Sequence, residues 1–317
     1  TAITTGDDNT FIGYASGDAT TTSTGNTAVG RTALSTNIVG GLSTAVGAYA
    51  LATQNPATAT DMYNTGMGYN AGGAVTTGLQ NTLIGALAGD ALTDADNNIA
   101  IGMGALTTDT LGSTSVAIGT DALSAQNFTT ATSTYNTAVG TSAGQSVTTG
   151  IHNTLIGGGA GDALTNASHN VALGYNALGT DTLGAKSTAL GRSALGAQNF
   201  TTATDAYNTA VGYDAGNAIT TGVKNVIIGG LAGDGAQTID ESVIIGYGAG
   251  SAVMTGHDNV LVGASAGAVL TSGHSSIAIG LGALAATTTG LYNTAIGFNA
   301  LTTNIDGDNN TAVGYQA

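Results

Sequence analysis

The clearest pattern in the chain is a short alternation of polar and apolar residues that ends on a glycine and recurs at fixed intervals. Asn208-Thr209-Ala210-Val211-Gly212 is a typical copy. The numbers of successive repeat glycines differ by 17, except over 47–68, 119–140 and 191–212, where they differ by 21, and these long intervals recur with a period of 72. Self-similarity at so short a period indicates a repeat architecture. The repeat glycines are Gly13, Gly30, Gly47, Gly68, Gly85, Gly102, Gly119, Gly140, Gly157, Gly174, Gly191, Gly212, Gly229, Gly246, Gly263, Gly280, Gly297 and Gly314.

The residues around each repeat glycine predict a short strand followed by a turn. Thr-Ala-Val alternates with period two, as a strand does. We expect the β-branched residue and the aliphatic residue two positions later to face inward, because such side chains suit a half-buried pleated surface. The glycine permits a turn closed to other residues, and the Ala three positions later is expected to be held small by close packing. The Asn or Ser that opens each copy is expected to bond neighbouring backbone or to form a ladder along the stack.

A single copy of the repeat is too short to bury a core alone. Stacking at about 4.8 Å would pair each strand with those above and below it. Helical repeats are excluded by the short period and by the glycine content. The sequence therefore predicts an all-β fold, a parallel β-solenoid of about 18 coils of 17 or 21 residues, with 1–317 forming one repetitive shaft. Large apolar residues are scarce, so we expect three copies to pack through their Ala and Gly columns as a homotrimer.

Composition and charge exclude several classes of binding partner. The formal net charge is −15, with only 4 Lys and Arg, which excludes the cationic surface that nucleic acids or an anionic membrane require. Charged residues make up only 7%, and the absence of Cys excludes disulfides and thiol chemistry. No apolar run approaches the roughly 20 residues of a membrane span. The chain starts and stops within the repeat pattern, so we expect a mature or excerpted piece of a longer extracellular protein.

The repeat resembles two groups of surface fibres. Ser115-Val116-Ala117-Ile118-Gly119 and Ser276-Ile277-Ala278-Ile279-Gly280 are similar to the repeat of trimeric autotransporter adhesin heads. The stretches 293–301 and 310–317 look like repeats of phage tail-fibre shafts. The resemblance covers essentially the whole chain. It implies a left-handed β-roll, a homotrimer, and a location on a cell surface or virion.

Candidate contact residues lie in the three long coils and in one tyrosine column. The insertions carry Asn55, Pro56, Asn127, Phe128, Asn199 and Phe200. These loops either present a contact surface or are tolerated insertions that pack their own Phe against the rod. Tyr63, Tyr135, Tyr207 and Tyr292 precede the repeat Asn at one shared position, where they either stack on glycans and neighbouring fibres or pack across coils. Specificity is also expected at the two variable residues after each repeat glycine.

Metal and catalytic sites are not predicted. His152 and His169 are one period apart, as are His257 and His274, so each pair should stack on adjacent coils. A metal site needs three or four converging ligands, so a solvated variable position is the expected role. Because no nucleophile, base and acid depart from their repeat columns, we expect no enzyme activity and no cofactor.

The function predicted from these observations is a structural extracellular fibre segment. It would act as a rigid spacer, in an adhesin or a phage tail fibre, with contacts to copies of itself, to a cell-surface glycan or to a host receptor. An ice-binding solenoid is one alternative, disfavoured because Thr is expected to face inward. A tail-spike depolymerase is another, disfavoured because no groove of carboxylates is evident.

Overall fold

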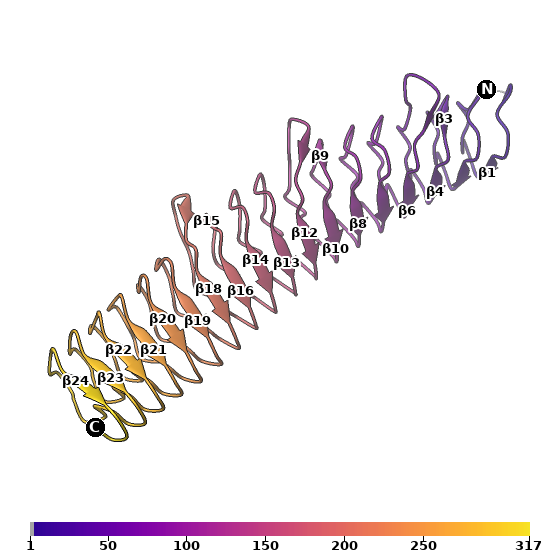
Figure 1. Ribbon diagram of the computed structural model, residues 1–317. Helices are drawn as coiled ribbons and strands as arrows, with labels where there is room; N and C mark the ends of the chain where they lie inside the picture. Colours follow the sequence, from indigo (N-terminus) through magenta and orange to yellow (C-terminus); the bar gives the residue numbers. More distant parts are fainter. Residues whose placement is uncertain (1–2) are drawn as a thin grey trace. The chain divides into compact units, whose positions relative to one another are not determined.

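A computed structural model describes residues 3–317 as two compact units, the first ending at Leu155 and the second comprising Ile156–Ala317. Each unit is built from the same coil, with short parallel strands stacked one coil after another (Figure 1). No helix occurs among the described residues. The predicted all-β parallel solenoid of about 18 coils is therefore confirmed.

Most strands contain the three residues before a repeat glycine. In the first unit they are β1 (Thr10–Ile12), β2 (Thr27–Val29), β4 (Thr44–Val46), β6 (Thr65–Met67), β7 (Thr82–Ile84), β8 (Ile99–Ile101), β10 (Val116–Ile118) and β12 (Thr137–Val139). The boundary between the units falls within β13 (Thr154–Ile156). The second unit contains β14 (Val171–Leu173), β16 (Thr188–Leu190), β18 (Thr209–Val211), β19 (Val226–Ile228), β20 (Val243–Ile245), β21 (Val260–Val262), β22 (Ile277–Ile279), β23 (Thr294–Ile296) and β24 (Thr311–Val313).

The register of these strands follows the sequence period. Thr10 lies opposite Thr27, which in turn lies opposite Thr44. Across the first long interval Thr44 lies opposite Thr65, so the additional residues do not shift the ladder. Every repeat column therefore becomes a line of like residues within each unit, as a solenoid requires.

The inward face of the strands is the opposite of the one predicted. The central residue of each strand points into the coil and is fully buried in all but the end coils, as Ala28, Ala45 and Ile244 show. The first and third residues, such as Thr27 and Val29, face outward and are partly exposed. The interior of a coil is filled by the strand centre together with residues from other parts of the coil, such as Leu34, so the first and third strand residues are left on the outer face.

The core of each coil is filled by compensation between two positions. Where the residue four after the repeat glycine is Leu, the strand centre is Ala, as for Leu34 and Ala28. Where that residue is Gly, the strand centre is usually large, as for Gly89 and Leu83. A Cβ on Gly89 would lie 2.7 Å from the Leu83 side chain, so both positions cannot be large. Gly66, Ala138 and Ala210 depart from this rule, each in the coil after a long coil.

The residue that opens each coil forms the predicted ladder. The Asn26 side chain accepts a hydrogen bond from the backbone N–H of Ser43 in the next coil, at 2.9 Å, and donates to the carbonyl of Gly40, also at 2.9 Å. The same two bonds recur at Asn64 and Asn98. These amides are fully buried, so their pairing satisfies polar groups that water does not reach.

Four positions in a typical coil have a positive φ, and the repeat glycine is the most demanding of them. Gly246 has φ +134, and a Cβ added there would lie 2.5 Å from the carbonyl oxygen of Gly263 in the next coil. Both the backbone angle and the close approach of the next coil require glycine at this position. The other three positions are left-handed and accept larger residues, including the β-branched Thr114 at φ +63.

Candidate binding surfaces

The outer face of the main sheet consists of the first and third strand residues of each coil. Eleven of the 18 first residues are Thr and seven are Val or Ile, while all 18 third residues are Val, Ile, Leu or Met. No residue of the 18 three-residue strands of the main sheet carries a charge. Several of the aliphatic side chains are substantially exposed in each unit, including Met67 in the first and Leu173 and Ile279 in the second. The third residues therefore form an exposed apolar column along this face, and exposed apolar surface of this kind is typical of an interaction site.

The three long coils project loops that are pinned to the coil before them. Figure 1 shows these loops extending beyond their neighbours at β3, β9 and β15. The contacts are three two-residue parallel ladders, each joining a long coil to the preceding one. The paired strands are β3 (Gly40–Gly41) with β5 (Thr60–Asp61), β9 (Gly112–Ser113) with β11 (Thr132–Ser133), and β15 (Gly184–Ala185) with β17 (Thr204–Asp205).

A buried polar network lies at the base of the loop in the first unit's second long coil. The carboxylate of Asp109 accepts hydrogen bonds from the backbone N–H of Gly112 at 3.1 Å and of Phe128 at 3.0 Å, and from Gln126 Nε2 at 2.5 Å. Gln126 Oε1 accepts from Asn136 Nδ2 at 2.9 Å. The second unit repeats this network at Asp181, Gln198, Phe200 and Asn208. Such a fully paired network fixes the loop rather than leaving it free to adapt.

The proposed contact loops do not present the apolar groups expected of them. Phe128 is only 7% exposed, Phe200 only 5%, and Pro56 is buried as well. Of the two alternatives for these loops, the burial of both Phe side chains favours insertions that pack their own Phe against the coils. Phe200 lies against the preceding coil, because a Cβ added to Gly184 would lie 2.7 Å from its ring. Asn55, Asn127 and Asn199 are exposed, so the loops offer polar groups alone at these positions.

The predicted tyrosine column lies on the surface and also packs across coils. Tyr63, Tyr135, Tyr207 and Tyr292 are each about half exposed and left-handed in backbone conformation. Tyr135 stacks on His152 with 5.4 Å between ring centroids, and Lys186 lies 5.1 Å from the Tyr207 ring. Lys186 also bonds Asp205 and the Tyr207 hydroxyl, and these bonds raise the pKa of the lysine.

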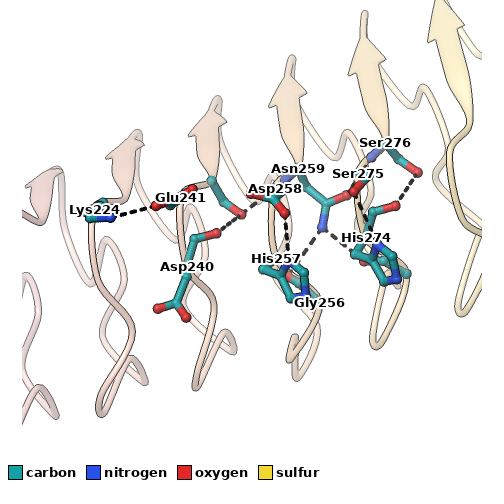
Figure 2. Close-up of polar contacts among 12 residues, drawn as sticks. Lys224, Asp240, Glu241, Gly256, His257, Asp258, Asn259, His274, Ser275 and Ser276 are labelled. Carbon is teal, nitrogen blue, oxygen red and sulfur yellow. Dashed lines mark hydrogen bonds and ion pairs between the residues drawn. The ribbon is translucent and has the colours of Figure 1, made fainter.

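Charged and histidine side chains follow one another along one edge of the second unit (Figure 2). Lys224 pairs with Glu241 at 2.7 Å, which raises the pKa of the lysine. His257 bonds Asp258 at 2.7 Å and stacks on His274, with centroids 5.0 Å apart and planes 8° apart. The predicted stacking of these two histidines is confirmed, although they stand one position earlier in the coil than His152 and His169. Stacked rings do not converge on one ion.

The residue directly after the repeat glycine carries an exposed aromatic group in many coils. In the second unit Tyr175, Tyr213, Tyr247 and Tyr315 occupy this position, and each is more than half exposed. The sequence indicated only that this position varies. Arg192 lies beside Tyr213, with its guanidinium 5.2 Å from the ring centroid and 2.8 Å from the hydroxyl.

A polar groove of about 690 Å³ lies on coils of the second unit. Its lining includes Asp162, Asn176, Ser193, Asn199 and Asn217. Burial raises the pKa of Asp162, while hydrogen bonds from its own backbone N–H and that of Ala163 oppose the shift. The groove therefore combines amide, hydroxyl and carboxyl groups on a surface without large apolar side chains.

Residues 3–317 contain no cluster of three or more His, Cys, Asp or Glu side chains arranged to hold a metal ion. The described part of the chain also contains no helix suited to crossing a membrane. No protein-family model matches the chain, and no curated protein matches it significantly.

Proposed function

We propose that this chain is a structural, non-enzymatic segment of an extracellular fibre whose copies associate through the outer face of the main sheet. The observation that supports this proposal is the uncharged outer face, on which every coil contributes one aliphatic and one β-branched side chain. All the charged residues stand in other columns. A chain of net charge −15 approaches a second copy with least repulsion through such a face.

The mode of association that we propose differs from the one expected from the sequence. The Ala residues of the strand centre and of the position three after the repeat glycine are fully buried within a single chain in the interior coils, as Ala45 and Ala50 show. They are not available to a second copy. Association through the outer face instead removes apolar side chains from water, at roughly 25 cal/mol for each Å² buried.

Three copies around a common axis are the assembly we propose. The resemblance of the repeat to adhesin heads and tail-fibre shafts supports a trimer, and supports a location on a cell surface or virion. A single coil has a thin core, so covering the outer face with two neighbouring copies adds apolar burial that one chain lacks. The segment then serves as a rigid spacer that holds other parts of a fibre away from the surface.

Two matched lysine substitutions test the proposal. Ile279 on the outer face is 39% exposed and Val269, outside the strands, is 42% exposed. A charge buried between copies is costly, whereas one in water is not. We expect Ile279→Lys to lower the mass measured by sedimentation from trimer to monomer, and Val269→Lys to leave the trimer intact. A wild-type protein that sediments as a monomer contradicts the proposal.

Ice binding is a second candidate, favoured by one observation. Thr10, Thr27, Thr44, Thr65 and Thr82 stand in five successive coils, in register and on the outer face. The inward placement that disfavoured this function is therefore wrong. The outward partner two residues later is aliphatic rather than a second Thr. Thermal hysteresis of the purified protein tests this candidate, and its absence rejects it.

A further inference from the structure

At the residue after the repeat glycine, four exposed Tyr and one exposed Leu stand at intervals of two coils in the second unit. We name this set the exposed row, and its members are Tyr175, Tyr213, Tyr247, Leu281 and Tyr315. Successive members are two coils apart, which corresponds to about 9.6 Å at the usual strand spacing. Aromatic groups at a regular spacing on a rigid scaffold indicate a ligand with a repeat of its own.

Two of the four coils between these members leave room for such a ligand, because they carry Gly230 and Ala264, the two smallest side chains. The other two carry Arg192 and Phe298, and Phe298 stacks on Tyr315 with ring centroids 5.2 Å apart. The open stretch of the row therefore runs from Tyr213 to Leu281. A Cβ added to Gly230 would lie 3.7 Å from Cδ2 of Tyr247, so the Tyr247 ring leans over the main chain of the coil before it. The ring is nevertheless 67% exposed. One side of the ring is therefore supported by the protein, while much of the ring remains open to solvent.

We infer that the exposed row binds a neutral, extended, β-linked polysaccharide. The faces of sugar rings carry C–H groups, which pack against the electron-rich faces of aromatic rings. In an extended β-linked chain alternate sugars are turned over, so the same face recurs every second ring, a repeat comparable with two coil spacings. The inference rests on the proposed function only for the location outside the cell.

Charge decides against anionic glycans as the ligand. The exposed row contains no cation, and Arg192 beside it is already engaged with Tyr213 and Asp214. The chain as a whole carries a net charge of −15, so a polyanion would be repelled. A neutral polysaccharide meets no such repulsion.

The polar groove supplies hydrogen-bonding groups next to the row. Asn176 and Ser193 line the groove, and each directly follows a residue of the aromatic position, Tyr175 and Arg192 respectively. Sugar hydroxyls both donate and accept, so a groove lined by amides, hydroxyls and one carboxyl suits them. Asp90 and Thr107 of the first unit stand 72 residues before Asp162 and Gly179, at the same repeat positions. Thr107 donates a hydrogen bond to Asp90 at 2.6 Å, whereas Gly179 has no side chain to do the same for Asp162. The missing side chain leaves Asp162 accessible from the groove.

Affinity electrophoresis of the intact chain tests the inference. The probes are hydroxyethylcellulose and glucomannan, with α-linked dextran and heparin as mismatched polymers. We expect retardation by the two β-linked polymers only. Tyr213→Ala and Tyr247→Ala should each weaken binding between about twofold and tenfold, since each removes one stacked ring. Tyr247→Phe should keep binding, and Tyr292→Ala, an exposed tyrosine of another column, should have no effect.

Three results overturn the inference. The first is a wild-type chain that none of the β-linked polymers retards, and the second is unchanged binding by the Tyr213→Ala/Tyr247→Ala double variant. The third is a double variant whose sedimentation mass falls to that of a monomer, which would make the row an interface between copies. A monomeric wild-type chain that still binds β-linked polymers contradicts the proposed assembly but leaves this inference standing.

Discussion

Substituting the repeat glycine should destabilise the solenoid through two separate costs, one from the backbone angle and one from a clash with the next coil. In Gly246→Ala the residue would keep φ near +134, a region that costs about 1–3 kcal/mol for a residue with a Cβ. The added carbon would also lie 2.5 Å from the carbonyl oxygen of Gly263. That atom belongs to the next coil's backbone and cannot rotate away. The combined cost is expected to exceed about 3 kcal/mol.

Two other glycines of the same unit separate the two contributions. Gly248 has φ +60 with nothing within 4 Å of an added Cβ, so Gly248→Ala should cost only the left-handed strain of about 1–2 kcal/mol. Gly230 has no positive φ and its Cβ would meet only Tyr247 at 3.7 Å, so Gly230→Ala should be neutral or slightly stabilising. Urea unfolding followed by circular dichroism measures all three. If Gly246→Ala loses no more stability than Gly248→Ala, the close approach between coils is not a constraint and the reasoning fails.

Three further predictions concern stability. Phe128→Ala combined with Phe200→Ala should free both loops and lower the free energy of unfolding by up to about 3–5 kcal/mol per site. We expect faster amide exchange in 127–134 and 199–206, and unchanged exchange would contradict the burial of the two Phe side chains. Asp234 Oδ1 has no hydrogen-bond partner and burial raises the pKa of this carboxyl. Its ionised form therefore destabilises the fold, so Asp234→Asn should raise the urea midpoint at pH 7, and the gain should vanish as the pH falls through the raised pKa towards 3.8, where the wild-type group is protonated. Thr114→Asn should stabilise by about 1 kcal/mol in the same assay, because a β-branched residue is strained at φ +63; a loss of stability would refute this.

The coil and its register could be predicted from the sequence because they depend on glycine. Only glycine tolerates both the backbone angle and the contact at positions such as Gly85 and Gly102, so its spacing records every coil. The Asn ladder was predictable for a similar reason, since a buried amide at Asn98 has few substitutes able to bond both the next coil and its own. Positions that permit one residue type are the ones that a single sequence reveals.

Which face of each strand is buried could not be predicted from alternation alone. A period of two defines two faces without saying which one is buried, and Val29 looks more like a core residue than Ala28. The signal for the buried face was that a large side chain at the strand centre accompanies a small one at the position four after the repeat glycine, as in Leu83 with Gly89. That pairing records a fixed interior volume, which hydrophobicity does not.

The candidate contact surfaces were only partly predictable. The insertion containing Phe128 was evident from its length, but its burial depends on Asp109 in the previous coil, which holds the Phe128 backbone. No local pattern links those two positions. The exposed row was also hidden, since Tyr213 and Tyr247 are separated by a coil that carries Gly230 at the same position.

Coils with Leu and coils with Gly at the position four after the repeat glycine follow a fixed order over much of the chain, and this order limits how the chain can change in length. From the second coil to the thirteenth, the position four after the repeat glycine reads Leu, Leu, Gly, Gly three times over, with the long coil always second. Removal of a single coil from this stretch would break that order. Removal of 64–135, which has the length of one set of four coils, would instead join Tyr63 to Asn136, so that each remaining coil keeps neighbours of the same types as before. Gene rearrangement within this stretch should therefore lengthen or shorten the stack by four coils at a time, about 19 Å.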